Sequence, residues 1–597
     1  MVWIVVTPRI AVVRALRRQR GSRPNLAEVG SFPVCLPQKG RTADPSANGK
    51  SLAVVLLVAL LLLLPFLDKP LHLDDPMFVW AAKRIVDHPA DFYGTDVNWC
   101  YKREPMARVN ENPPLVSYAL AAAGAVLGWS EPALHGAMLG AALLAVAGVW
   151  VLARRLGAPP LLAGFALLAM PGFLVSSTTL MADVLATALW TWAVVAWVRG
   201  LQEEETGWLL AGALLAGLCL LTKFVGLALL PLLLAYTALR YRRLDRRMLL
   251  LAVPLGVALL YRARMLARYG VDPFRAVGSF ALEVRQASKA SALELPWLGL
   301  GYLGGTCLPA LFLAGWIFRR RGWVACAVFF FAVGAGLLLL GSFSGVELRS
   351  AQGTRVILLL HLAAFMTCGA IVLALTLQHA VRMRSAEAIL LGLWVVGIFL
   401  FGSLFNWSTN VRSILPAAPA VAIVLASELQ RQDRGRGQAI PLALLGLSTL
   451  AGLLVAQGDL AYARSAREAA VALTREHGQG SRPLWFEGSW GFQYYMERDG
   501  ASKINWDEFQ VLAGDPIVRP SSNTCRIKIS PYMAHADREE TFPVHAVAST
   551  VTGGAGFYSH LLGVAPYVFG TPPDETYSVY HIPVNFYELR QVLPLKR

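Results

Sequence analysis

Residues 51–67 read "SLAVVLLVALLLLLPFL", an apolar run without a charged side chain. A helix needs about 20 such residues to cross the roughly 30 Å hydrocarbon core of a bilayer. Similar runs recur along the 597-residue chain, which is 56% hydrophobic and only 15% charged. A soluble protein carries closer to a quarter charged residues. The sequence therefore predicts a polytopic α-helical membrane protein.

The basic residues form short bursts between the apolar runs. Lys and Arg number 54 against 38 Asp and Glu, which gives a net charge of +16. Bursts of this kind orient membrane helices, whereas nucleic-acid-binding proteins cluster their charge on one face of a soluble domain. We therefore expect no nucleic-acid partner. The bursts are Arg154–Arg155, Arg240–Arg247, Arg319–Arg321, Arg382 with Arg384, and Arg431–Arg436.

The bursts also predict a topology. With all of them on the cytoplasmic side, the chain crosses the membrane about 13 times. This requires residues 113–129, a short apolar segment interrupted by glycines, to dip into the membrane or lie along it with both ends on the outer side. Residues 1–50 are then either a basic, disordered cytoplasmic tail or the result of an upstream start-site error, and residues 51–458 are the transmembrane domain. The chain after about residue 459 is extracytoplasmic.

Two extracytoplasmic regions follow from this topology. Residues 68–112 form a long polar and aromatic loop. Residues 459–597 contain runs such as "RPLWFEG" and "YSVYHIPV", separated by Gly, Pro and Asp, which are typical of short strands in a small α/β domain. Cys100 lies in the first region and Cys525 in the second. Both cysteines then face a side of the membrane on which disulfides form, and the two could pair.

Two adjacent acids, Asp74 and Asp75, follow the first apolar run within the segment "HLDDPMFVWAAK". Ionisable groups near a membrane are costly and usually functional. Asp75 could instead begin a short helix, because Pro76 is typical of a first helical position. That interpretation leaves Asp74 unexplained.

Other charged residues fall on the same side in this topology, and each has a structural alternative. Asp183 could cap the next helix, Lys223 could extend to the interface, and Arg355 and Arg412 could be ordinary boundary residues. Arginines on the extracytoplasmic side run against the usual preference of basic residues for the cytoplasmic side, which favours a functional role for them. We therefore count Asp183, Lys223, Glu347, Arg355 and Arg412 as candidate substrate-binding residues.

These residue types suit one kind of chemistry. A carboxylate can act as a general base toward a hydroxyl, and cations can hold a phosphate leaving group. A site at the membrane surface suits a donor whose phosphate is attached to a lipid. The sequence contains no H-E-x-x-H, no complete phosphate loop and no dinucleotide fingerprint that would indicate a competing activity.

The order of these segments resembles the GT-C superfamily of membrane glycosyltransferases, and within it the branch of protein O-mannosyltransferases and the lipid A aminoarabinose transferase. The matching segments are "LDDPMFVWAA", "NPPLVSY", "PGFLVSSTTLMAD", "LTKFVG" and "NVRSILPAAPA". The resemblance implies inverting sugar transfer from a polyprenyl-phosphate donor to a hydroxyl of a lipid, glycan or protein. It also implies a place among the lipids of the bacterial inner membrane.

The resemblance assigns roles to individual residues. Asp74 matches the catalytic acid of the first outer loop, and Asp75 stands at the supporting second acidic position. Asp183 matches the acid of the second outer loop. Lys223 and Arg412 stand where related proteins have cations near the donor phosphate.

One position departs from the family pattern. The segment that often reads "KPPL" begins here with Asn112, which we count as a further candidate substrate-binding residue. Either another cation supplies the missing charge or the donor contact differs. The paired acids could hold a divalent cation, although the branch resembled generally needs no cofactor.

Two other functions remain open. A transporter or flippase of lipid-linked sugars usually shows repeat symmetry and charges near the membrane midplane, and neither is evident here. A non-catalytic assembly subunit would tolerate replacement of Asp74.

Overall fold

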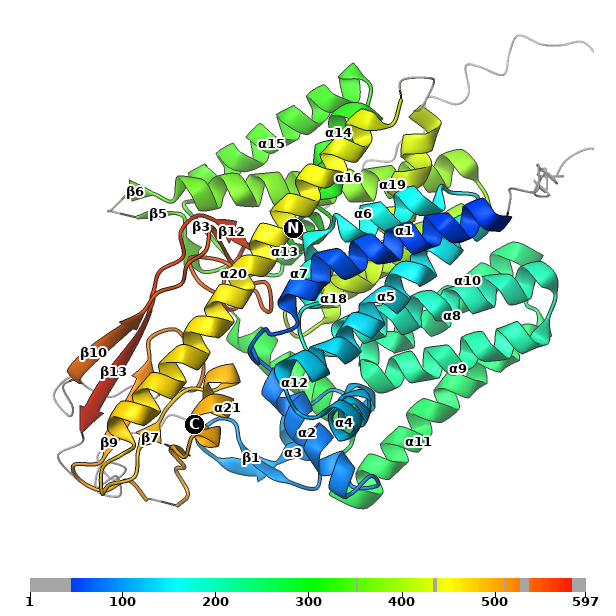
Figure 1. Cartoon of the computed structure of the whole chain (residues 1–597). Helices are drawn as coiled ribbons and strands as arrows, with labels where there is room; N and C mark the ends of the chain where they lie inside the picture. The colour runs from blue at the N-terminus through cyan, green and yellow to red at the C-terminus, as the bar shows by residue number, and fades with distance from the viewer. Residues whose placement is uncertain are drawn as a thin grey trace, which may run out of the picture. The chain divides into compact units, whose positions relative to one another are not determined.

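Long apolar helices make up most of the chain in the computed structural model (Figure 1). The structure describes residues 45–288, 290–350, 353–432, 437–508, 510–526 and 536–581. Most of the predicted N-terminal tail therefore lies outside the described residues. Residues from Ser51 onward form one unit.

The described residues contain 10 helices that are long and apolar enough to cross a membrane, or 11 if the bent pair α13 (Leu295–Thr306) and α14 (Pro309–Ile317) is one span. This confirms the polytopic helical fold. The helices in these spans are α1 (Pro45–Leu63), α5 (Glu131–Arg155), α8 (Asp183–Glu203), α10 (Leu229–Tyr241), α11 (Ala252–Tyr269), α15 (Arg320–Leu340), α16 (Val356–Met383), α17 (Ala386–Leu400), α19 (Ala418–Gln432) and α20 (Ala439–His477). The spans that contain α10, α11, α17 and α19 also include the short helices next to them, and run over Phe224–Tyr241, Arg246–Tyr269, Ala386–Phe405 and Val411–Gln432.

The predicted count of about 13 crossings is higher than this number. Two apolar segments that the expected topology counts as crossings form shorter helices. One is α9 (Thr206–Thr222), which has 17 residues. The other is divided into α6 (Pro160–Leu168) and α7 (Pro171–Ser176). Pro171 opens α7, and because proline lacks a backbone N–H and clashes with the preceding turn, it interrupts the helix.

The described residues of the basic bursts gather at one end of the helices, as the topology predicts. There the arginines pair with glutamates of neighbouring helices: Arg155 with Glu203 at 2.9 Å, Arg240 with Glu387 at 3.0 Å, and Arg382 and Arg431 with Glu428 at 2.9 and 2.8 Å. Asp183 begins α8 and Lys223 follows α9, so both lie at the ends of these helices that are far from the arginine bursts.

The first loop folds into α2 (Asp75–Asp87), the antiparallel hairpin β1 (Asp96–Asn98) and β2 (Arg103–Pro105), and α3 (Met106–Val109). It is followed by α4 (Leu115–Leu127), the short apolar segment predicted to return without crossing. Glu131, which begins α5 directly after it, accepts a hydrogen bond from the Tyr495 hydroxyl at 3.1 Å.

Shorter elements join the later helices. They are α12 (Pro273–Ala287), α18 (Val411–Ile414), and two hairpins between α15 and α16: β3 (Ser342–Phe343) with β4 (Val346–Glu347), and β5 (Arg349–Ser350) with β6 (Gly353–Thr354).

The C-terminal region is built on a five-stranded mixed sheet in the order β10-β13-β9-β7-β8. β7 runs parallel to β8 and β9, while β13 is antiparallel to β9 and β10. The elements are β7 (Trp485–Phe486), α21 (Trp490–Arg498), β8 (Ser502–Lys503), β9 (Pro516–Pro520), β10 (Ala536–Phe542), β13 (Glu575–His581) and the separate pair β11 (Ala548–Ser549) with β12 (Val568–Phe569).

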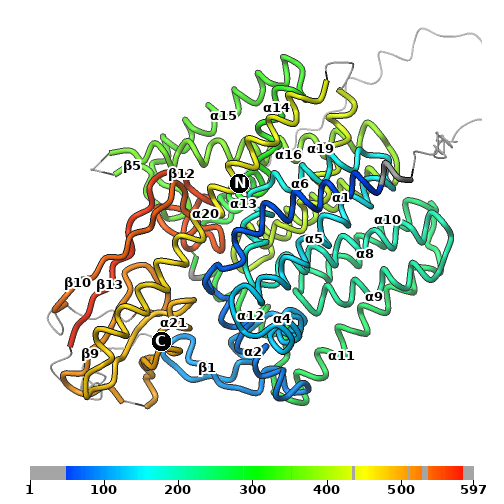
Figure 2. The backbone as a smooth tube through the Cα atoms, in the orientation of Figure 1, coloured from blue at the N-terminus to red at the C-terminus, as the bar shows by residue number. Residues whose placement is uncertain are grey.

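Helix α20 connects the two parts of the fold. It is a single helix of 39 residues, and the expected domain boundary near residue 459 falls inside it. Figures 1 and 2 show α20 running from the other long helices to the strands, with the β1 hairpin of the first loop close to α21.

The spans differ in how deeply they are packed. In the most apolar 18 residues of each span, the buried share is 89% for Val411–Gln432 and 78% for Asp183–Glu203, against 6% for α15. The first two spans carry Arg412 and Asp183. Both side chains are therefore held by the most completely enclosed helices of the described chain.

Candidate active site

A cavity of about 600 Å³ lies at the end of the helices that is remote from the arginine bursts. Its walls come from the first loop, the turn after α9, α12, the turn before α18, and the C-terminal region. Of the residues predicted from the sequence, Asp74, Asn112, Lys223 and Arg412 line it. The structure thus brings together four candidates from widely separated segments.

A chain of ion pairs organises this end of the helices. Arg412 Nε donates to Asp183 Oδ2 at 2.7 Å, and Arg412 Nη1 donates to Asp74 Oδ2 at 3.1 Å. Lys223 Nζ donates to the other oxygen of Asp183 at 2.5 Å. Asp183 therefore lies between two cations and fixes their positions.

The two acids in this chain differ in exposure. The Asp183 side chain is 1% exposed and the Asp74 side chain is 44% exposed. A buried carboxylate with two cationic partners is held in its charged form, so Asp183 has an organising role. Asp74 is the carboxylate that a ligand in the cavity can reach.

Local sequence explains where the two cations point. Lys223 has an extended backbone (φ −157°) between α9 and the 3-10 helix Phe224–Ala228. Arg412 lies on α18, whose N-cap Asn410 accepts a hydrogen bond from Ser413 N at 2.7 Å. Each cation therefore lies where one helix ends and another begins, and its side chain lines the cavity.

The turn before α2 separates the roles of Asp74 and Asp75. Asp75 is fully buried and does not line the cavity. Its two oxygens accept hydrogen bonds from the backbone N–H groups of His72 and Leu180, both at 2.9 Å. Asp75 therefore holds the turn before α2 through both oxygens, and its supporting catalytic role stays a prediction.

Burial raises the pKa of Asp75 to about 7, although Lys69 and the two amides favour the charged form. The unfolded carboxyl titrates near pH 4, so the free energy of unfolding should fall as the pH rises from about 4 to about 7, and then stay constant. Asp75→Asn cannot ionise. In detergent micelles, its melting temperature relative to wild type should therefore increase between about pH 5 and about pH 8. A difference that does not change with pH would contradict this assignment.

Two predicted substrate-binding residues lie elsewhere. Glu347 is exposed on β4, and Arg355 is exposed just before α16. Neither is among the residues that line the cavity. The hairpins between α15 and α16 fold back on themselves, since the Arg355 N–H donates to the Leu348 carbonyl at 2.9 Å. The sequence order of charged residues could not reveal this local folding.

Asn112, which replaces the family lysine, lies beside two further polar residues of the cavity. Its backbone N–H donates to Asn110 Oδ1 at 3.1 Å, and its carbonyl accepts from the Tyr93 hydroxyl. The neighbouring Glu111 also lines the cavity, and burial raises its pKa to about 8. The segment "ENPPL" thus contributes an amide and a neutral acid rather than a cation. The sequence did not indicate Glu111, because the family motif begins at the next residue, Asn112.

A second buried network lies beneath the Asp74 turn. Lys69 and Asp459 are both 0% exposed, and their Nζ and Oδ2 atoms are 2.5 Å apart. His72 Nε2 lies 3.3 Å from Asp459 Oδ1, and the Tyr558 hydroxyl donates to Asp459 Oδ2 at 2.7 Å. Asp459 therefore ties α20 to the first loop and to the loop that carries Tyr558. Tyr558 also lines the cavity, and no local sequence pattern indicates this long-range contact.

Cys100 and Cys525 form a disulfide across a sequence separation of 425 residues. The sequence left open whether these two cysteines pair, and in the structure they do. Both cysteines line the cavity, so the bond joins the first loop to the C-terminal region at the cavity wall.

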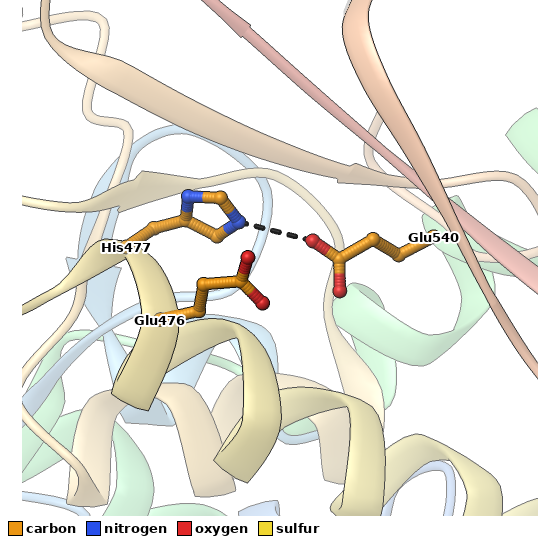
Figure 3. A group of neighbouring side chains, drawn as sticks. All are labelled: Glu476, His477 and Glu540. Atoms are coloured by element: carbon orange, nitrogen blue, oxygen red, sulfur yellow. Dashed lines mark hydrogen bonds and ion pairs between the residues drawn. The ribbon is translucent and has the colours of Figure 1, made fainter.

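One group in the described part of the chain has the spacing of metal ligands: Glu476, His477 and Glu540 (Figure 3). His477 Nε2 lies 3.1 Å from Glu540 Oε1. Arg538 forms ion pairs with both glutamates and offsets part of their charge. None of these residues lines the cavity, so the group is explained by ion pairing within the C-terminal region.

Comparison with solved structures finds weak overall similarity. The oligosaccharyltransferase of Archaeoglobus fulgidus, tethered to an acceptor peptide, is 14% identical with a TM-score of 0.46; the match covers 77% of this chain and 64% of that one. ArnT from Cupriavidus metallidurans in the apo state is 16% identical with a TM-score of 0.43, covering 89% of this chain and 98% of that one. At these TM-scores the similarities assign no activity or ligand. Comparison with curated proteins finds no match.

Comparison with protein families gives a match within the helical part. Residues 111–263, which include Asn112, Asp183 and Lys223, match the family described as dolichyl-phosphate-mannose-protein mannosyltransferase. The match confirms the resemblance that the sequence motifs indicated: over these residues the chain is similar to this family of membrane glycosyltransferases.

Proposed function

We propose that the chain transfers a sugar from a polyprenyl-phosphate donor to the hydroxyl group of an acceptor. The observation that carries this proposal is the exposed carboxylate of Asp74 beside Arg412 and Lys223 in one cavity. Asp74 would accept the proton of the acceptor hydroxyl as its oxygen attacks the anomeric carbon of the sugar. The phosphate leaves with the electron pair of the broken bond, and the two cations stabilise its charge.

The lining beside the cations supports a lipid-linked donor. Phe224 follows Lys223 directly, and Phe280, Phe401, Trp407 and Leu561 line the same cavity. A site with a few charged groups among apolar side chains suits a phosphate attached to a hydrocarbon chain. The description of the matched family names a donor of this type.

The ion pairs favour a single displacement with inversion. A double displacement needs a second carboxylate that can attack the sugar. Asp183 is buried, and its two oxygens accept from Lys223 and Arg412, while the oxygens of Asp75 accept from amides. Among the acids that pair with Arg412 and Lys223, Asp74 is thus the one available to the reaction; Glu104 and Glu111, which also line the cavity, are not part of these ion pairs.

The same contacts lead us to propose that transfer needs no metal ion. The oxygens of Asp183 and Asp75 are already used, and Arg412 and Lys223 supply positive charge. Transfer measured after treatment with EDTA should therefore equal transfer by untreated protein. A loss that added Mg²⁺ or Mn²⁺ restores would contradict this.

We further propose that the cavity opens on the extracytoplasmic side, because the arginine bursts lie at the other end of the helices. A membrane-impermeant thiol reagent added to intact cells should label Asp68→Cys in the first loop and leave Arg243→Cys, within a burst, unlabelled. Both positions are exposed. Labelling of Arg243→Cys alone would reverse the orientation.

The function is tested with purified full-length protein in lipid nanodiscs. Radiolabelled sugars are supplied on a polyprenyl phosphate or on a nucleotide, together with a mixture of envelope glycolipids, oligosaccharides and peptides. We expect label to pass to an acceptor from the lipid-linked donors only. Transfer from nucleotide sugars alone would overturn the donor assignment. Movement of intact lipid-linked sugar across a vesicle membrane without transfer would favour a flippase.

A further inference from the structure

We infer that the cavity wall formed by the first loop and the C-terminal region is an acceptor subsite for saccharides. Trp99 is the contact residue, and Lys503 is the residue that positions it. This inference rests on the proposed function and names the class of acceptor. The wall consists of Trp99 and Cys100 from the first loop and Trp490, Thr524 and Cys525 from the C-terminal region.

The C-terminal region donates hydrogen bonds to three backbone carbonyls in residues 98–101. Lys503 Nζ and Ser489 Oγ both donate to Trp99 O at 2.6 Å. Gln493 Nε2 donates to Asn98 O at 2.9 Å, and the N–H of Trp506 donates to Tyr101 O at 2.7 Å. The Cys100–Cys525 disulfide fixes the same segment covalently.

Lys503 is built into this wall rather than exposed to solvent. The residue is 7% exposed, and its ammonium group donates to Trp99 O, Ser489 Oγ and Gln493 Oε1 at 2.6, 2.9 and 2.7 Å. It also lies 5.8 Å from the centre of the Trp99 ring. An ammonium group has three N–H donors, so all of them are engaged in holding the wall.

Unusual backbone conformations also concentrate here. Leu73, Tyr101, Trp490 and Cys525 have φ values of 46°, 59°, 65° and 53°. Three of these residues line the cavity, and Tyr101 follows Cys100 in the chain. Non-glycine residues with positive φ cost free energy and persist where surrounding contacts impose them, often at ligand sites. The wall is therefore held in a fixed shape at a cost in conformational free energy.

The side chains of the wall suit a saccharide. An indole ring offers a flat apolar face, on which the C–H face of a sugar ring can rest. Glu104, Asn110 and Thr524 line the same cavity and offer acceptors and donors for sugar hydroxyls. This combination of aromatic surface and short polar groups matches a polyhydroxylated ring.

A peptide acceptor fits this wall less well. Peptides commonly bind by adding a strand to free backbone groups. Here the carbonyls of Asn98, Trp99 and Tyr101 already accept hydrogen bonds from the C-terminal region. The observations therefore favour side-chain recognition of a sugar over backbone recognition of a peptide.

Saturation-transfer NMR tests the subsite without requiring turnover. The probes are cellobiose, maltose, chitobiose and a serine-containing pentapeptide, added to full-length protein in nanodiscs without donor. We expect a disaccharide to receive saturation from wild type, with at least a fivefold smaller signal for Trp99→Ala and a retained signal for Trp99→Phe. Trp323→Ala is the control, because Trp323 is 55% exposed and does not line the cavity.

Lys503→Met is tested in the transfer assay. It should raise the KM of the saccharide acceptor about tenfold and leave the KM of the lipid-linked donor unchanged, a split that general loss of folding would not give. The inference is overturned if no disaccharide binds wild type, if Trp99→Ala binds as wild type does, or if only the peptide binds. Because binding is measured without donor, these results are independent of whether the proposed transfer occurs.

Discussion

Asp74→Asn should lower the rate of sugar transfer by about 10³-fold, within the range lost when a general base is removed. The amide cannot accept the proton of an attacking hydroxyl. It keeps the size of the side chain, and its oxygen can still accept from Arg412 Nη1, which lies 3.1 Å from Asp74 Oδ2. The donor site around Arg412 and Lys223 should therefore remain intact, so that kcat falls while the KM of the donor stays close to that of wild type.

The chain offers a matched control for this variant. Asp68 is an acid of the same loop, with a 58% exposed side chain paired to Arg464 at 2.8 Å, and it does not line the cavity. Asp68→Asn should transfer sugar at the wild-type rate. Equal activity of the two variants at matched expression would show that Asp74 is not the base.

Asp459→Asn should lower the free energy of unfolding by about 3–5 kcal/mol, the cost of leaving one partner of a buried ion pair without the other. Lys69 is 0% exposed and lies 2.5 Å from Asp459, so its charge would lose its compensation in a closed environment. The Tyr558 hydroxyl and the His72 ring would lose a carboxylate partner as well. The first loop should loosen together with the loop that carries Tyr558.

Unfolding in detergent micelles measures this loss, and Asp68→Asn is again the control. The Asp68–Arg464 pair is exposed, and such pairs contribute about 0–1 kcal/mol. The double variant Lys69→Met with Asp459→Leu should recover part of the loss, because no charge is then buried alone. A stability for Asp459→Asn equal to that of Asp68→Asn would contradict the role given to this pair.

The sequence predicted the helical fold because membrane-spanning helices carry their signal locally. The apolar runs and the arginine bursts located most spans and the common end of the bursts. The differences arise where local signals are weak. Pro171 divides one apolar segment into α6 and α7, and α9 has only 17 residues.

The site was predictable only in part. Asp74 and Arg412, 338 positions apart, could be paired through the resemblance but not through any local pattern. Pro76 and the resemblance assigned different roles to Asp74 and Asp75, but the sequence does not show the turn at Leu73, with φ of 46°, after which Asp74 lines the cavity and Asp75 is buried. Trp99, Lys503 and Tyr558 were missed because their roles depend on contacts across hundreds of residues.

The unbroken course of α20 sets a fixed distance between its start and Asp459. Asp459 lies 20 residues after the helix start at Ala439, about 30 Å at 1.5 Å per residue, which equals the thickness of the hydrocarbon core. The remaining residues of the helix rise beyond that level toward the sheet. In the proposed orientation, α20 therefore places Asp459, and with it the part of the first loop that Lys69 holds, about one hydrocarbon thickness from the end of the helices that carries the arginine bursts.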